Sequence, residues 1–586
     1  MKDHLQRGAI PPTARPKFFG AAGLIPALLC ISCLDGRVVG AALDAGSGRD
    51  AGSAPDAGST PKKAFRAGAS KVPITPMVET LIDSNDNGLY DSGEVFEDLN
   101  GNGVFDPVWV AGFGQGRLAH GVLDDLWARC LFLEFGDERL VLVALDLVGF
   151  NANRIADAKD AIQASHGIPK ERVVIASTHT HSGPDAIGYW GPTFGTPGRD
   201  PAYMDLLQRK IVEGVGLAME TAVEAAVKFT SEEIPDVFDC QKHEEANGCA
   251  GDLVRDGDEP GAPGRDPIIV DRNLFAVQFL SERDGLTVAT MVNIAAHPEI
   301  LWDGNHFVSS DYPHFERNEI ENALGGVSIH FSGALGGMMT PTVAQNSYVE
   351  VERFGRSIGR RVLDMLAAAA VVSVDKLGVS AGYAFFPIDE KEWAEIAKDL
   401  GVIEVPEGRL IFSMRDCKEK YGDFGCDEEE IAPCAETAQV FGEPMKKGCA
   451  PIMVQTATVG DAQIVTVPGE LFPELANGLP DDFSEFDPIE TRPNKYFPQH
   501  DPEDEWTQHA SPYTVGQPLR VLMTGKHKII IGLANHEGGY FVPTSDFRPV
   551  APMVGAAGDH YEESVSLGPR STDVLMKKLA KLLEGR

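Results

Sequence analysis

Apolar, β-branched runs separated by helical patterns are the feature that most restricts the fold of this chain. Five runs are apolar enough to form buried strands, and they occupy residues 140–145, 172–176, 288–294, 463–467 and 528–533. Two stretches carry apolar residues at every fourth position, which predicts helices. One comprises Leu207, Ile211, Val215, Met219, Val223 and Val227, and the other comprises Phe354, Ile358, Val362 and Leu366. This interleaving predicts an α/β (mixed α+β) fold, with residues 64–586 forming a single large domain with inserted loops.

The residues before that domain predict export. Basic residues precede a short apolar run over residues 18–31, which is the order of a secretory signal. Residues 30–33 (CISC) resemble a bacterial lipobox, so residues 1–33 are predicted to end in a lipid anchor on Cys33 that binds a membrane surface. Residues 34–63 repeat Asp-Ala-Gly units and predict a disordered linker. We therefore expect an outer-membrane or periplasmic lipoprotein, with a freely secreted protein as the alternative.

The charge of the chain argues against one class of partner. It carries 87 Asp and Glu residues against 51 Lys and Arg residues, which gives a net charge of −36. A surface of that sign repels phosphate backbones, so no nucleic-acid partner is predicted.

The cysteines follow the pattern of an exported protein. Setting aside Cys30, Cys33 and the apolar-flanked Cys130, six of them lie in two polar stretches, and none forms a C-x-x-C pair. Short loops close easily, so local disulfides are predicted. The pairs are Cys240 with Cys249, Cys417 with Cys426, and Cys434 with Cys449; the second stretch alone allows three connectivities.

Four of the predicted strands are followed in sequence by residue types that bind metals or act as acids and bases. His179 and His181 follow the strand at 172–176, and His297 follows 288–294. Glu470 follows 463–467, and residues 535–540 (NHEGGY) follow 528–533. Sites in open α/β sheets collect at the carboxyl ends of strands, so these side chains are expected to converge. Imidazole and carboxylate are ligands that zinc favours, although a lone histidine at a strand end is usually structural.

The segment after the first strand contains two calcium-loop patterns. The first fits D-x-[DN]-x-[DN]-G-x5-E, with predicted ligands Asp83, Asn85, Asn87, the Leu89 carbonyl, Asp91 and Glu94. The second has Asp98, Asn100, Asn102 and Asp106, but Trp109 stands where the final glutamate belongs. We expect at least one structural Ca²⁺ within residues 83–106; the alternative is a polar surface turn.

Several motifs together resemble the neutral (non-lysosomal) ceramidase family. They are residues 66–76 (RAGASKVPITP), 178–184 (THTHSGP), 293–298 (NIAAHP), 309–311 (SSD), 468–470 (PGE), and 535–540 with Thr544. They occur in the family's order across residues 64–586. The resemblance implies an amidohydrolase that cleaves N-acylsphingosine-type amides, with Zn²⁺ held by His179, His297, Glu470 and Tyr540. It also implies that His181 relays a proton beside the metal and that Tyr561 stabilises the oxyanion.

The chain also departs from the family pattern. Residues 337–341 (GMMTP) stand where the family has Gly-Asp-Val-Ser-Pro, which gives Thr340 the place of a catalytic serine. The family's substrate-facing arginine is not identifiable, and no C-terminal immunoglobulin-like domain is expected. Three functions therefore remain open. They are ceramidase-like hydrolysis of a small amphiphilic amide, hydrolysis of a different amide or ester, and a catalytically lapsed surface-binding lipoprotein.

Overall fold

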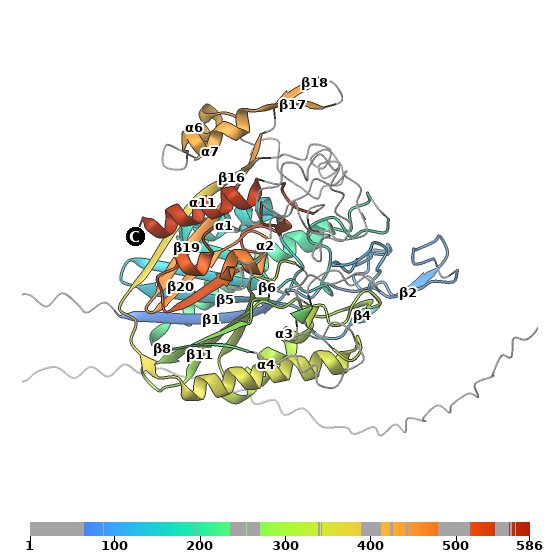
Figure 1. Cartoon of the computed structure of the whole chain (residues 1–586). Coiled ribbons are helices and arrows are strands. Elements are labelled where there is room, and N and C mark those ends of the chain that lie inside the picture. Colours follow the sequence, from blue (N-terminus) through green and yellow to red (C-terminus); the bar gives the residue numbers. More distant parts are fainter. Residues whose placement is uncertain are drawn as a thin grey trace, which may run out of the picture. The chain divides into compact units, whose positions relative to one another are not determined.

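The structure is a computed structural model, and its described residues all belong to the unit Lys62–Arg586 (Figure 1). They are residues 64–234 without 86 and 194, 253–254, 270–387 without 338, 339 and 342, 412–421, 426–446 without 441 and 442, 448–478, 516–544, 562, 565–568 and 570–585. The predicted signal, the linker, the pair Cys240 and Cys249, and Tyr561 lie outside these residues.

A nine-stranded sheet forms the centre of the fold. Its order is β13-β11-β10-β8-β1-β5-β6-β7, with β15 also paired to β8. Only the β6–β7 and β11–β13 pairs are parallel. The strands are β1 (Phe65–Pro73), β5 (Trp127–Phe135), β6 (Glu138–Leu145), β7 (Val173–Ser177), β8 (Val223–Glu233), β10 (Asn273–Ser281), β11 (Thr287–Ile294), β13 (Val327–Ser332) and β15 (Val371–Val372).

A second, four-stranded sheet packs on one face of the first. Its order is β16-β19-β20-β22, and β20 and β22 are parallel. The strands are β16 (Leu377–Pro387), β19 (Cys449–Val459), β20 (Ala462–Thr466) and β22 (His527–Ile531). Leu142 and Val174 of the large sheet share a buried cluster with Ile464 and Ile529 of the small one. This contact between the sheets is the central core.

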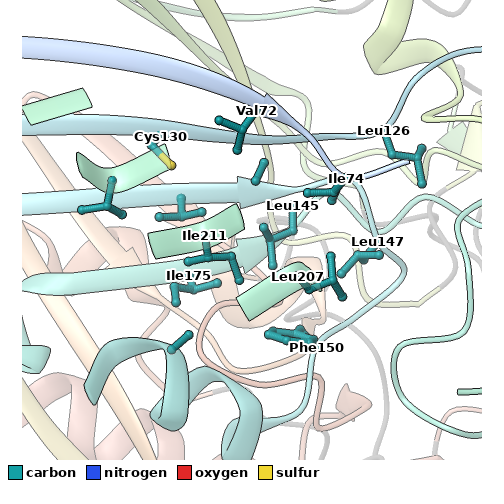
Figure 2. Packing of buried hydrophobic residues seen from close by; sticks show 14 of the residues in the cluster. Val72, Ile74, Leu126, Cys130, Leu145, Leu147, Phe150, Ile175, Leu207 and Ile211 are labelled. Atoms are coloured by element: carbon teal, nitrogen blue, oxygen red, sulfur yellow. The ribbon is translucent and has the colours of Figure 1, made fainter. Parts of the chain in front are cut away.

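Helices cover the outer faces of both sheets. The larger ones are α1 (Ala152–His166), α2 (Pro201–Glu220), α3 (Tyr312–Leu324), α4 (Tyr348–Ala368) and α11 (Ser571–Glu584). Figure 2 shows Leu145 and Ile175 of the large sheet gathered with Leu207 and Ile211 of α2. Helices α3 and α4 cover β10 and β11, whereas α11 covers β16 and β19 of the small sheet on the opposite side (Figure 1).

The shorter elements form connections and small two-stranded sheets. The pairs are β2 (Leu81–Ile82) with β3 (Val95–Phe96), β4 (Gly121–Val122) with β12 (Phe307–Val308), β9 (Leu253–Val254) with β14 (Thr340–Pro341), β17 (Thr437–Val440) with β18 (Glu443–Lys446), and β21 (Glu470–Leu471) with β23 (Tyr540–Phe541). The short helices include α6 (Met414–Tyr421), α7 (Glu428–Ile431), α8 (Pro473–Asn477) and α9 (Leu519–Leu522), with 3-10 turns η1 (Lys170–Arg172) and η4 (Ala432–Ala435).

The structure confirms all five predicted strands and the helix α4, but one helical prediction is wrong. The four-residue pattern that begins at Leu207 predicts a helix through Val227, whereas α2 ends at Glu220 and Val223 starts β8. β8 pairs with β10 over nine residues, from Ala225 to Glu233. Cross-strand pairing and the β-branched residues of this segment therefore override the helical spacing.

Two of the predicted disulfides are confirmed. Cys417 is bonded to Cys426 and Cys434 to Cys449, and they pack around the buried Phe385 next to α6 and α7. Within the described residues, no helix has both the length and the apolar character needed to cross a bilayer.

Candidate metal centre

Three of the four predicted strand ends bring their side chains together, and the fourth pairs with one of them along the backbone. β7 leads into His179 and His181, β11 into His297, β20 into Glu470 of β21, and β22 into Tyr540 of β23. Parallel pairing of β20 with β22 continues into β21 and β23, where Glu470 lies opposite Tyr540. All five side chains are buried, and the one with the largest exposed fraction is His181 at 6%.

A carboxylate bridges two of the histidines. Glu470 Oε1 lies 3.3 Å from His179 Nε2, and Glu470 Oε2 lies 3.1 Å from His297 Nε2. His179 Nδ1 is 2.5 Å from the carbonyl oxygen of Val148, which leaves Nε2 as the nitrogen that faces the cluster. Metal-binding histidines usually donate their second nitrogen to a carbonyl or carboxylate in this way.

The ring nitrogens of the three histidines are close enough to share a metal ion. One ligand atom from each of His179, His181 and His297 can be chosen so that all lie within 4.8 Å of one another. Both nitrogens of His181 are buried and make no hydrogen bond to any described residue. An unsatisfied buried polar group costs roughly 1–3 kcal/mol, so a ligand at this place relieves a real penalty. The residues present thus fit a divalent metal such as zinc.

Burial and mutual charge set the protonation of the cluster. Burial opposes the charge of Glu470, but His179 and then His297 hold the pKa of this carboxyl down at about 2. Against burial, which lowers it, Glu470 raises the pKa of His179. Burial and the neighbouring histidines hold the pKa of His181 well below its usual range. His181 is therefore neutral at pH 7, as a ligand or a proton acceptor must be.

The backbone around the cluster is strained, and side-chain amides hold it. His179, Leu533 and Asn535 all have positive φ, at 68°, 51° and 68°. The Asn535 amide donates to Met453 O and to Gln455 Oε1, at 3.1 and 2.8 Å, across the small sheet. Strained non-glycine residues persist only where surrounding contacts hold them, and they are common at functional sites.

A buried arginine organises the loops that carry His181. Arg117 donates to the carbonyl oxygens of Ala111, His181 and Asn305, at 3.0, 3.2 and 2.8 Å. Gly112 packs its backbone against the His181 ring with φ of 109°, a conformation that favours glycine and leaves no space for a Cβ. The position of His181 is therefore fixed from its backbone side.

Aromatic rings border the cluster next to His181. Phe113 contacts the His181 ring edge-on, with centroids 4.9 Å apart, and Trp302 lies 5.0 Å from Phe113. Both are only partly buried, so they lie between the buried metal centre and solvent. An apolar border of this kind suits an apolar substituent of a substrate.

Three acidic or hydroxyl groups complete the surroundings. Thr340 donates a hydrogen bond to Glu299, whose other oxygen lies 3.0 Å from His181 Nδ1. Burial raises the pKa of Glu537 to about 8, with smaller opposing contributions from His179. Sequence reasoning missed Glu299 and Glu537. Both could have been suspected from the sequence, because Glu299 lies close to His297 and Glu537 lies close to Tyr540.

The two calcium-loop patterns adopt the same conformation. In each, the first Asp accepts from the backbone N–H of the sixth-position glycine, at 2.6 Å for Asp83 and 2.8 Å for Asp98. In each, the two Asn side chains donate to the Asp at position nine, which is Asp91 or Asp106. The second pattern is therefore a structural copy of the first, although it lacks the final glutamate.

Glu79 takes the place of that missing glutamate. In the first loop, Glu94 accepts from the N–H groups of Ser84 and Asp91, at 2.7 and 2.9 Å. In the second loop, Glu79 accepts from the equivalent groups of Leu99 and Asp106, at 3.0 and 2.9 Å. Glu79 precedes both loops in the sequence, which is why a search for the pattern does not find it.

Comparisons with known proteins agree with this architecture. No protein-family model and no curated protein matches the sequence. Two solved structures are similar at 15% identity and a TM-score of 0.53: neutral ceramidase from Pseudomonas aeruginosa, and a ceramidase complexed with C2. The alignments cover 89% of this chain and 74% and 75% of theirs. The structural neighbours are thus neutral ceramidases, and this chain shares the mixed α/β fold of those enzymes.

Proposed function

We propose that this chain is an exported zinc-dependent hydrolase that cleaves an N-acyl amide, with a ceramide-like lipid amide as its substrate class. The observation that carries the proposal is the buried His179–His297–Glu470 cluster, which three strand ends form beside His181. The fold shared with neutral ceramidases supports the same reaction class.

The residues in this cluster divide into ligands and a proton carrier. His179, His297, Glu470 and Tyr540 are proposed to hold the zinc. The first three contact one another, and Tyr540 lies opposite Glu470 in the β21–β23 pair. Zinc held by these residues would polarise the amide carbonyl and lower the pKa of a water molecule to roughly 7. His181, neutral and without a hydrogen-bond partner among the described residues, is placed to accept a proton and return it to the departing amine.

Two further catalytic assignments stay predictions. Tyr561 is proposed to stabilise the oxyanion, although it lies outside the described residues. Thr340 is proposed to take part at the position of the family serine, and its hydroxyl is engaged with Glu299. Phe113 and Trp302 are proposed to contact the acyl chain, since they border His181.

Metal analysis combined with a substrate screen tests the proposal. Purified protein is expected to contain one zinc per chain and to release fatty acid from at least one of N-acylsphingosine, N-acylethanolamine or an N-acyl amino acid. A zinc chelator should abolish turnover, and added Zn²⁺ should restore it. Protein that holds no transition metal, or that cleaves only esters, would contradict the proposal.

We also propose that both loops of the insert bind Ca²⁺. The ligands of the first are Asp83, Asn85, Asn87, Asp91 and Glu94. Those of the second are Asp98, Asn100, Asn102 and Asp106, completed by Glu79. Such loops usually bind Ca²⁺ through about seven oxygen atoms, two of them from one glutamate. The equivalent contacts of Glu94 and Glu79 support Glu79 as that glutamate in the second loop.

Export and a lipid anchor on Cys33 complete the proposal. The disulfides Cys417–Cys426 and Cys434–Cys449 support an oxidising compartment. Mass spectrometry of protein from a bacterial membrane fraction should detect a diacylglyceryl group on Cys33, and its absence would favour free secretion.

A further inference from the structure

Glu299 connects Thr340, which stands at the position of the family serine, to His181. Its side chain is fully buried, and one carboxylate oxygen, Oε1, accepts the hydroxyl of Thr340. The other oxygen, Oε2, lies 3.0 Å from His181 Nδ1. Within the described part of the chain, neither Glu299 Oε2 nor His181 Nδ1 makes a geometrically complete hydrogen bond. Two unsatisfied groups, one able to donate and one able to accept, therefore face each other at hydrogen-bond distance.

The main chain holds the two residues in this arrangement. The His181 N–H donates to Pro298 O, one residue before Glu299, at 3.0 Å. The His181 carbonyl oxygen accepts from both terminal nitrogens of Arg117, each at 3.2 Å. The Nδ1–Oε2 distance of 3.0 Å lies within hydrogen-bond range, although the alignment of the bond is incomplete. Such bonds are commonly loose without substrate and tighten in the working complex.

We propose that Glu299 is a positioning residue that holds His181 in the tautomer with a proton on Nδ1. This leaves the lone pair of His181 Nε2 free for proton transfer in the metal centre. Thr340 in turn fixes Glu299 by occupying Oε1, so that Oε2 alone meets the ring. The inference rests on the proposed hydrolase function, and it assigns Thr340 an indirect role through Glu299. A base oriented by a third group is a recurring arrangement in enzymes.

A second buried pair supplies the matched control. His330 Nδ1 lies 2.8 Å from Glu316 Oε2, and both side chains are fully buried. This pair packs between β13 and α3 and is not part of the His179–His297–Glu470 cluster. Replacing Glu316 therefore measures the effect of removing a buried His–Glu contact without touching the metal centre.

Kinetics and metal content of Glu299→Gln test the proposal. A carboxamide can offer its N–H₂ group to Nδ1 and so favours the wrong tautomer. We expect zinc content to be unchanged and kcat to fall about 10–100-fold, the usual cost of losing such a partner, with a much smaller change in KM. Glu316→Gln should leave kcat unchanged. Equal losses in both variants, or full activity in Glu299→Gln, would overturn the proposal.

Nitrogen-15 NMR of histidine-labelled zinc protein tests the tautomer without any substrate. The His181 signals are assigned by their absence in His181→Asn. Wild type is expected to show a protonated Nδ1 and an unprotonated Nε2, and Glu299→Gln should lose this pattern. An Nε2-protonated ring in wild type would overturn the inference even if the enzyme is active. Conversely, if the protein shows the expected tautomer but cleaves no amide, the inference about Glu299 stands and only the proposed function is rejected.

Thr340 provides a milder pair of variants in case Glu299→Gln does not fold. Thr340→Ser keeps the hydroxyl that donates to Glu299 and should lose less of the kcat than Thr340→Val does. Thr340→Val removes the donor with little change in volume and should lower kcat, with zinc content and melting temperature preserved. If Thr340→Ser and Thr340→Val behave alike, the hydroxyl does not act through Glu299.

Discussion

The histidines of the metal centre differ in what their ring nitrogens contact. His179 and His297 both turn Nε2 toward Glu470, and His179 also has its Nδ1 committed to the Val148 carbonyl. His181 has no complete hydrogen bond to either nitrogen among the described residues. A histidine that binds a metal needs one ring nitrogen held by a hydrogen bond, which fixes the ring. A histidine that carries a proton needs one ring nitrogen available for proton transfer. The three rings are therefore expected to respond differently to substitution.

His297→Ala and His181→Ala should separate metal binding from turnover. His297→Ala removes one of the two proposed imidazole ligands and should lose both zinc and activity, because imidazole nitrogen is a ligand that zinc favours and only one would remain. His181→Ala should keep its zinc and lose turnover by roughly 10²–10⁴-fold, the usual contribution of a general acid–base group. Metal analysis and amide hydrolysis measure both effects.

His166→Ala serves as the control, since His166 contacts only Val212 O at the end of α1 among the contacts described. It should match wild type in both measurements. If His181→Ala loses as much zinc as His179→Ala, then His181 is itself a metal ligand and the proposed roles are reversed.

The insert between β1 and β5 illustrates how an element depends on its ligands. Its two loops contain few buried apolar residues: Phe105, Trp109 and Leu118 form one small cluster with Leu81 and Phe96. Backbone N–H groups and asparagine side chains draw the carboxylates of Asp83, Asp91 and Glu94 together in one loop. Mutual repulsion of these groups should be relieved when calcium binds.

Calcium removal should therefore destabilise the insert but not the metal centre. A ligand at about 100 times its Kd stabilises the folded form by about 2.7 kcal/mol, so chelation should lower the melting temperature and increase proteolysis within residues 83–106. Zinc content should not change. Calorimetry should find two Ca²⁺ in wild type and one in either Glu79→Gln or Glu94→Gln, with Glu213→Gln as the exposed control. Two ions in Glu79→Gln would show that Glu79 is not a ligand.

At the scale of the whole molecule, the layers meet at a buried lysine. Lys159 lies on α1 with its Nζ 3.7 Å from Met453 Sδ of β19, so it joins the helical layer to the small sheet. Only 3% of its surface is exposed, and burial lowers the pKa of its ammonium to about 7. In the unfolded chain the pKa of a lysine is about 10.4. The unfolded state therefore binds the proton more tightly than the folded state does.

Lys159→Met should stabilise the protein most at low pH. Between about pH 7 and pH 10.4 the unfolded chain carries one more proton than the folded protein. This lysine therefore makes the free energy of unfolding rise with pH, by about 1.4 kcal/mol per pH unit. Below pH 7 its destabilising effect is complete. Urea unfolding of variant and wild type should show a difference of a few kcal/mol, on that scale, at pH 6 that shrinks toward pH 10. A pH-independent difference would place the lysine in a solvated environment.

The strands and three residues of the buried cluster could be predicted from the sequence. The five apolar runs became β6, β7, β11, β20 and β22, because a buried strand needs only local apolar, β-branched composition. His179, His297 and Glu470 were found from their places after strands, since the topology of an α/β sheet brings strand ends together. Local spacing misled at Val223, where pairing with distant strands, not periodicity, decided the conformation.

The tertiary structure alone decided the partners that complete each site. Glu79 reaches the second calcium loop from outside its pattern, and Glu299 and Thr340 meet although β12, α3 and β13 lie between them in sequence. No local signal reports such contacts, because a carboxylate's partner depends on which surfaces the packed core brings within about 3 Å. The same holds for Lys159, whose lowered pKa comes from burial against Met453 and not from its helix. Ligand type can be read from sequence, whereas protonation and orientation are set by the packed fold.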